Sequence, residues 1–116
     1  DAAAPHIEVA IIAVEPPVPD ATVFVVARPP GGGMPYAAVR RPAAMLPFTV
    51  LLDDLVGMTE QRVLSNAETF EVVVRLSVSG SPQAQSGDWV WRSDTLDLRD
   101  YERGKKLKAA LASGST

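Results

Sequence analysis

Hydrophobic and polar residues alternate most clearly along residues 70–79 of the chain. Phe70, Val72, Val74, Leu76 and Val78 hold every second position, and Glu71, Arg75, Ser77 and Ser79 lie between them. Successive side chains of a strand point to opposite faces, so one face of this segment is apolar. The pattern predicts a strand of an antiparallel sheet with one face in the core and the other towards solvent.

Two segments in the first half of the chain show the same alternation. In residues 7–14, Ile7, Val9 and Ile11 share one face. In residues 46–52, Phe48, Val50 and Leu52 do so. Between these segments, residues 15–20 contain three prolines, which lack the backbone donor that a central strand needs. The sequence therefore predicts two strands and a connecting loop.

A hairpin is predicted over residues 21–41. The apolar and β-branched run 22–26 is followed by Pro-Pro-Gly-Gly-Gly at 29–33, and an extended pattern resumes over 35–40. A strand, a Gly/Pro-rich loop and a second strand form a hairpin whose loop is longer than two residues. Because the first strand is apolar at consecutive positions, we expect it to be covered on both faces.

The last third of the chain predicts strands followed by a helix. Residues 89–92 form a short edge strand, which residues 96–98 can extend. Over residues 100–112, Tyr101, Leu107 and Leu111 are spaced for one helix face, and Asp100 is a suitable N-cap. This pattern predicts a short C-terminal helix, after which the chain frays.

These elements together predict an all-β fold. Roughly six to seven short strands with turns between them are typical of a two-sheet antiparallel sandwich, and an immunoglobulin-like topology fits them best. A closed barrel or a cupredoxin-like sandwich is the alternative. We expect the sandwich to occupy residues 1–99, and the C-terminal helix and tail to occupy residues 100–116.

Composition agrees with a single domain and excludes several classes of protein. The 116 residues are 47% hydrophobic, and the net charge of −3 has the wrong sign for a nucleic-acid binder. No apolar run approaches the roughly 18 residues of a membrane-spanning helix. The chain begins at Asp1 without a methionine, which indicates a processed protein or a piece of a longer one.

Candidate catalytic chemistry is sparse. His6 is the single histidine and cysteine is absent, so no base–orienter pair and no thiolate or blue-copper site can be assembled. Asp53 and Asp54 are better explained as a turn or cap than as a calcium site. The glycines at 31–33 are not followed by the Lys-Ser/Thr of a phosphate-binding loop. We therefore expect no enzyme activity, no metal and no cofactor.

The candidate binding residues lie on the hairpin and on the edge strand. Met34, Pro35 and Tyr36 follow the glycine run, and Arg40 lies further along the same strand. Trp89 and Trp91 hold alternate positions and so share one face. On an outer face the two tryptophans would form a contact surface, and on an inner face they would belong to the core. The sequence leaves both alternatives open.

The order of several motifs resembles one known family. These motifs are DATVFVVAR at 20–28, GMPYA at 33–37, LPFTV at 46–50, LDD at 52–54, VRLSVSG at 74–80, and PQ with GD at 82–83 and 87–88. They are similar to the FVFAR strand, MPLA, LP-T-LDD, AR-S-SG and PQPGD turn of the C-terminal domain of cytochrome c-type biogenesis protein H. The resemblance covers about residues 7–88, and none of its motifs is catalytic.

The resemblance implies a role and a location. The parent protein would be anchored in the inner membrane and carry a tetratricopeptide-repeat domain before this periplasmic immunoglobulin-like domain. Its partners would be apocytochrome c and the membrane subunits of the haem-ligation complex. This domain would then be a non-catalytic docking or chaperone module. The alternative is a generic secreted β-sandwich module that binds a carbohydrate or a protein.

Overall fold

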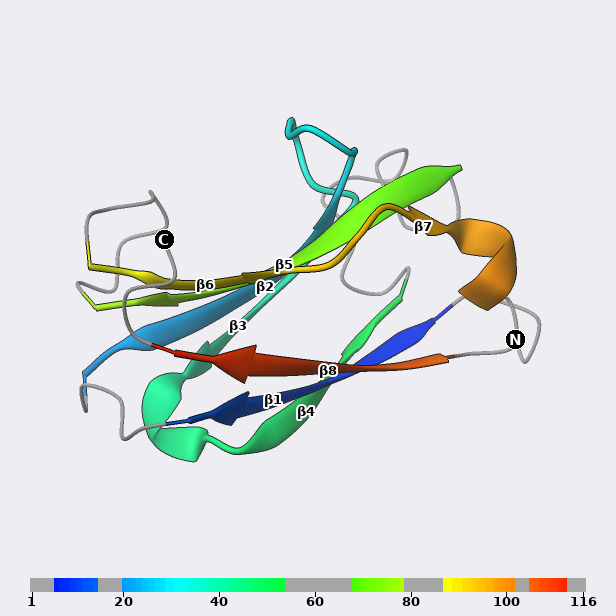
Figure 1. Cartoon of the computed structure of the whole chain (residues 1–116). Coiled ribbons are helices and arrows are strands. Elements are labelled where there is room, and N and C mark those ends of the chain that lie inside the picture. Colours follow the sequence, from blue (N-terminus) through cyan, green and yellow to red (C-terminus); the bar gives the residue numbers. More distant parts are fainter. Residues whose placement is uncertain (1–5, 15–19, 54–67, 79–86, 102–104, 113–116) are drawn as a thin grey trace.

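A computed structural model describes residues 6–14, 20–53, 68–78, 87–101 and 105–112 of the chain. Two β-sheets pack face to face (Figure 1). The smaller sheet has the order β4-β1-β8, formed by Phe48–Leu52, Ile7–Ala13 and Lys105–Leu111. The larger has the order β3-β2-β5-β6, formed by Ala37–Pro42, Thr22–Arg28, Thr69–Ser77 and Trp89–Arg92, and β7 (Leu96–Asp97) also pairs with β5. The predicted two-sheet sandwich is confirmed.

Short 3-10 turns are the helical elements in the described part of the chain. They are η1 (Ala43–Met45), between β3 and β4, and η4 (Leu98–Tyr101), after β7. No helix among the described residues is long and apolar enough to cross a membrane. The strands therefore provide nearly all of the regular structure.

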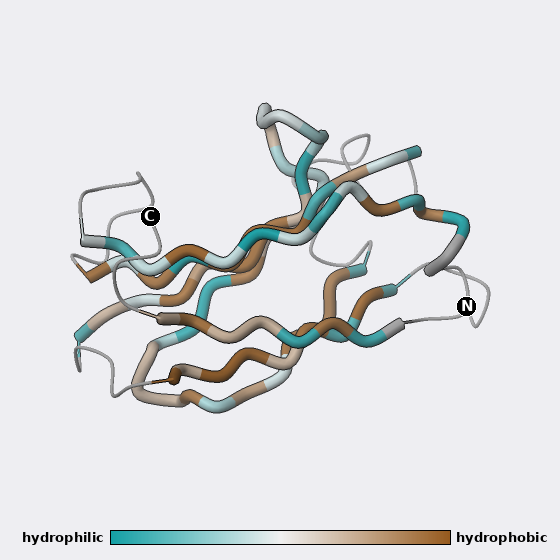
Figure 2. Tube along the Cα trace, viewed as in Figure 1, coloured by the Kyte–Doolittle hydropathy of each residue, from teal (hydrophilic) through white to brown (hydrophobic). Residues whose placement is uncertain are grey.

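The core forms where the apolar faces of the two sheets meet. Its largest fully buried side chains are Ile7, Val9, Ile11, Val23, Val25, Leu52, Phe70, Val72, Val74, Leu76 and Leu111. Figure 2 shows hydrophobic stretches along strands of both layers. The predicted inward rows of β1, β4 and β5 are confirmed, because their apolar residues at every second position face the other sheet and leave water there.

Strand β2 of the hairpin is fully covered on one face only, whereas the sequence predicted that both faces are covered. Val23, Val25 and Ala27 are fully buried, whereas Phe24 and Val26 are half-buried on the outer face. Only the inner face meets the smaller sheet, so apolar residues at consecutive positions do not imply burial on both sides here. The outer face of β2 thus carries partly exposed apolar side chains.

The outer face of β5 is more buried than the alternation of its residues predicted. Glu71 and Ser77 were expected to face solvent, but their exposed fractions are 8% and 0%, and Val73 between them is 7% exposed. Because β5 lies between β2 on one side and β6 and β7 on the other, side chains from both neighbours crowd its outer face. Alternation correctly assigned the inner row but underestimated the burial of the outer one.

The predicted C-terminal helix is wrong, because residues 105–111 form strand β8. Strand β8 runs parallel to β1 along its whole length, from Ile7 opposite Lys105 to Ala13 opposite Leu111. Leu107 and Leu111 fit a helix face, but Leu107, Ala109 and Leu111 also alternate as in a strand. The segment forms a strand because it pairs with the edge of β1 that β4 leaves open. The sandwich therefore continues through Leu111 instead of ending near residue 99.

Leu111 is the last residue of β8 and reports on whether this segment packs as a strand. Its side chain is fully buried, so Leu111→Ala is expected to lower the free energy of unfolding by about 2–5 kcal/mol. Lys108→Ala, on the exposed side of the same strand, should change it by less than about 0.5 kcal/mol. Urea denaturation measures both. Equal, small changes would indicate that the segment is not packed as β8.

Candidate functional site

The loop between β2 and β3 stands away from both sheets (Figure 1). Gly31, Gly32 and Gly33 have φ angles of +86°, +109° and +116°. The amide of Gly32 donates a hydrogen bond of 3.0 Å to the carbonyl of Pro29, which closes the turn. A Cβ at Gly31 or Gly32 would meet no atom within 4 Å, so backbone conformation, not space, requires glycine there.

The predicted Met-Pro-Tyr segment is held where this loop rejoins the sheet. Met34 is 55% exposed, whereas Pro35 and Tyr36 are half-buried. The amide of Tyr36 donates a hydrogen bond of 2.7 Å to the carbonyl of Ala27, and the side chain of Tyr36 packs against the core. Tyr36 thus anchors the segment, and Met34 presents an apolar side chain to solvent.

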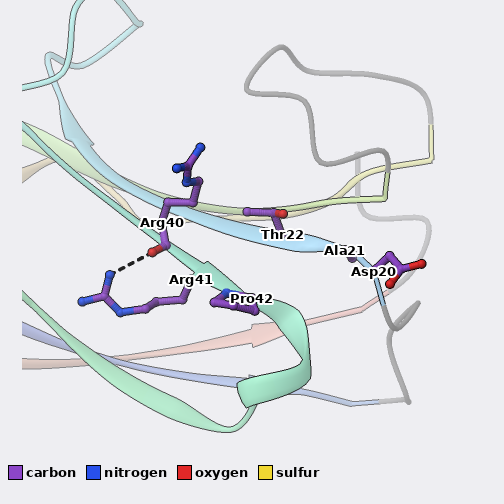
Figure 3. A pocket seen from close by; sticks show the side chains of 6 residues that line it. All are labelled: Asp20, Ala21, Thr22, Arg40, Arg41 and Pro42. Carbon is purple, nitrogen blue, oxygen red and sulfur yellow. Dashed lines mark hydrogen bonds between the residues drawn. The ribbon is translucent and has the colours of Figure 1, made fainter.

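Arg40 extends the exposed surface along β3, beside a shallow pocket. The pocket has a volume of about 370 Å³ and is lined by Asp20, Ala21, Thr22, Arg40, Arg41 and Pro42. Figure 3 shows the guanidinium groups of Arg40 and Arg41 pointing in different directions, and neither points at Asp20. Nη1 of Arg41 donates a 2.8 Å hydrogen bond to the carbonyl of Arg40. Because its polar groups do not converge, the pocket lacks the arrangement that fixes a small molecule.

The two tryptophans lie on the inner face of β6. Trp89 is opposite Leu76, and Trp91 is opposite Val74, both of which point into the core. Trp89 is 6% exposed, and Trp91 is half-buried against the core. Of the two alternatives that the sequence left open, the structure has the core arrangement. No exposed tryptophan pair is formed.

The outer face of the larger sheet holds a group of charges that sequence reasoning missed. Arg75 Nη1 lies 2.8 Å from Asp88 Oδ2, and the Arg75 guanidinium carbon lies 5.0 Å from the centre of the Phe24 ring. The amide of Val78 donates a 3.2 Å hydrogen bond to Asp88 Oδ1. The Asp88 side chain is only 1% exposed, so its charge depends on these contacts.

A second ion pair lies further along the same face. Arg28 Nε donates a 2.8 Å hydrogen bond to Glu71 Oε1, joining β2 to β5. The partners in both pairs are more than ten residues apart in the chain. Pairing of β2 with β5 brings Arg28 to Glu71, and pairing of β5 with β6 brings Arg75 to Asp88, which directly precedes β6. The alternation of hydrophobic and polar residues within a single strand does not predict such pairs.

A family model matches residues 7–108 of the chain, and its description is the Ig-like domain of cytochrome c-type biogenesis protein H. The match covers most of the 116 residues and extends into β8. The chain belongs to this family. A search of curated proteins and a search of solved structures each found no match.

Membership of the family gives the domain a role in cytochrome c maturation. The fold agrees with it, since the family is Ig-like and the structure is a two-sheet sandwich. The hairpin residues, Arg40 and both tryptophans all lie within the matched segment. The family match therefore includes every candidate binding residue.

The remaining candidates for metal or acid–base chemistry are dispersed. Among the described residues, no group of three or more His, Cys, Asp or Glu side chains is arranged to hold a metal ion. His6 is half-buried just before β1, and Asp53 is half-buried just after β4. Asp54 lies outside the described residues.

Proposed function

We propose that this domain is a non-catalytic docking module of the cytochrome c maturation machinery. It binds a protein partner through the end of the β2–β3 hairpin, at Met34, Pro35 and Tyr36, and along β3 at Arg40. The observation that carries the proposal is an exposed methionine two residues from Tyr36, whose backbone hydrogen bond and core packing anchor the end of the hairpin. Loops on a rigid sheet are where binding residues concentrate, and methionine adapts its shape to partner surfaces.

The family supports the location and the partners. In this proposal the domain lies in the periplasm as part of a longer, membrane-anchored protein that carries tetratricopeptide repeats. Its partners are apocytochrome c and the membrane subunits of the haem-ligation complex. The domain positions these proteins and leaves the chemistry of haem attachment to the other subunits.

The alternative of a carbohydrate-binding module has lost its main support. Such a module would stack exposed aromatic rings on sugars, and Trp89 and Trp91 were the residues available for this. The structure buries Trp89 and half-buries Trp91 on the inner face. Protein docking is the function that the exposed residues fit better.

Binding of the partners tests the proposal. The longer protein that carries Met34→Ala/Arg40→Ala is expected to capture at least about tenfold less apocytochrome c or haem-ligation subunit, because each of a few interface anchors carries a large share of the affinity. A matched control is Met45→Ala/Arg99→Ala, since Met45 is 56% exposed and Arg99 also lies at the surface. Truncation after residue 98 is unsuitable as a control, because it removes β8.

Equal capture by the two double variants would contradict the proposed surface. Absence of capture by the unmodified protein would contradict the docking function itself. Both variants change exposed side chains, so their circular dichroism and melting temperatures should match those of the unmodified protein.

A further inference from the structure

The outer face of the larger sheet has an apolar centre and two arginines at opposite edges. Strand register places one row of side chains as Arg40, Phe24, Arg75 and Val90, and the next as Ala38, Val26, Val73 and Arg92. Arg40 lies on the edge strand β3, and Arg92 lies on the opposite edge strand β6. The two cations therefore occupy diagonal corners of one surface.

The charges in the middle of this face are paired, whereas those at its corners are not paired within the described part of the chain. Arg75 is matched by Asp88, and Arg28 by Glu71. The described residues place no carboxylate within ion-pair distance of Arg40 or Arg92, and both arginines are exposed. The face thus has an excess of positive charge on a chain whose net charge is −3.

Apart from Arg75, the side chains between the two corners are apolar, and most of them are partly accessible. Phe24, Val26, Ala38 and Val90 are half-buried, around Val73, which is 7% exposed. The Arg75 guanidinium lies over the Phe24 ring, which attracts the cation and holds the two side chains together. An apolar centre with a charged rim is the usual composition of a protein-binding surface.

We infer that this face binds a segment of a partner protein that carries two carboxylates on either side of an aliphatic side chain. The inference rests on the proposed function only for the identity of that partner. Charge complementarity selects the segment, because Arg pairs with carboxylate in a planar, two-point geometry. The apolar side chains of this face are half-buried or buried, so they offer little area for insertion into a membrane, which favours a protein segment.

The spacing of the arginines defines the segment. Three strand separations of about 4.8 Å and an offset of two residues place the two Cα atoms about 16 Å apart. In an extended peptide, residues i and i+4 lie on the same side, about 13 Å apart. Flexible arginine side chains make up the difference, so the segment has the pattern Glu-x-Leu-x-Glu or its aspartate equivalent.

A designed peptide tests the face directly. The 116-residue chain, labelled with 15N, is titrated with Ser-Glu-Thr-Leu-Thr-Glu-Ser at low ionic strength, and with the same peptide carrying Gln for both Glu. The acidic peptide should bind with a Kd of about 1 mM or lower and shift the amides of Phe24, Val26, Val73 and Arg92. The Gln peptide should bind at least about tenfold more weakly.

Matched variants distinguish binding at this face from a general effect of removing positive charge. Arg40→Gln/Arg92→Gln should weaken binding of the acidic peptide at least about tenfold. Lys106→Gln/Lys108→Gln removes two charges from the smaller sheet and should leave the binding unchanged. Loss of the same size in both variants, equal binding of the two peptides, or no shift at about 5 mM peptide would overturn the inference. Tighter binding to phosphatidylglycerol vesicles than to the peptide would also overturn it.

The proposed function is tested separately. If the peptide binds as expected but apocytochrome c and the haem-ligation subunits do not, the acidic-segment site stands and the cytochrome c docking function fails. If those proteins bind and Arg40→Gln/Arg92→Gln has no more effect than the lysine variant, docking through Met34, Pro35 and Tyr36 stands, whereas this site and the Arg40 contact of the docking surface fail.

Discussion

Val74→Asp is expected to abolish the folded domain. Val74 is fully buried at the centre of the larger sheet, opposite Val25 on β2 and Trp91 on β6. An unpaired carboxylate at that position costs several kcal/mol, and small domains have only about 5–15 kcal/mol of stability in total. Far-UV circular dichroism and a urea titration should show little or no folded protein.

Thr49→Asp is the matched control for this substitution. Thr49 lies on β4 with its side chain exposed, so the same carboxylate should change the free energy of unfolding by less than about 1 kcal/mol. A cooperative unfolding transition near that of the unmodified protein in Val74→Asp would contradict the inward placement of Val74.

Arg75→Ala is expected to lower the free energy of unfolding by about 3–5 kcal/mol, because it leaves a buried charge without its partner. Asp88 is 1% exposed, and its Oδ2 lies 2.8 Å from Arg75 Nη1. The substitution also removes the cation from the face of the Phe24 ring. A urea titration with both the single variant and Asp88→Asn/Arg75→Met measures the effect.

The double variant distinguishes lost charge pairing from lost packing. It neutralises the buried carboxylate while Met fills much of the arginine volume, so it should recover a substantial part of the lost stability. Arg99→Ala breaks an exposed ion pair with Asp97 and should leave stability unchanged. If Arg75→Ala were as mild as Arg99→Ala, Arg75 would face solvent, as alternation along β5 first predicted.

The sequence predicted the sandwich because its inward rows are regular. Ile7, Val9 and Ile11 on β1, like the even-numbered apolar residues of β5, alternate in a way that only a strand satisfies. The C-terminal segment was assigned wrongly because Leu107 and Leu111 satisfy both periods. Its pairing with β1, almost a hundred residues away in the chain, decides the structure, and no local pattern contains that information.

The candidate site was predictable in part. The glycine run and Met34 identified an exposed hairpin end from composition and turn chemistry alone. The inner-face position of Trp89 and Trp91 needed the register of β6 against β5. The diagonal placement of Arg40 and Arg92 likewise follows from four paired strands, which alternation within single strands does not reveal.

Cytochrome c maturation in cells is the most direct test of the proposed docking surface. In a bacterium that lacks the longer protein, Met34→Ala/Arg40→Ala and Met45→Ala/Arg99→Ala versions of it are expressed at equal abundance, and covalently bound haem is measured by staining of c-type cytochromes. A several-fold loss of haem-bound cytochrome c is expected with Met34→Ala/Arg40→Ala, and normal levels are expected with Met45→Ala/Arg99→Ala. Normal levels with both variants would contradict the proposed docking surface.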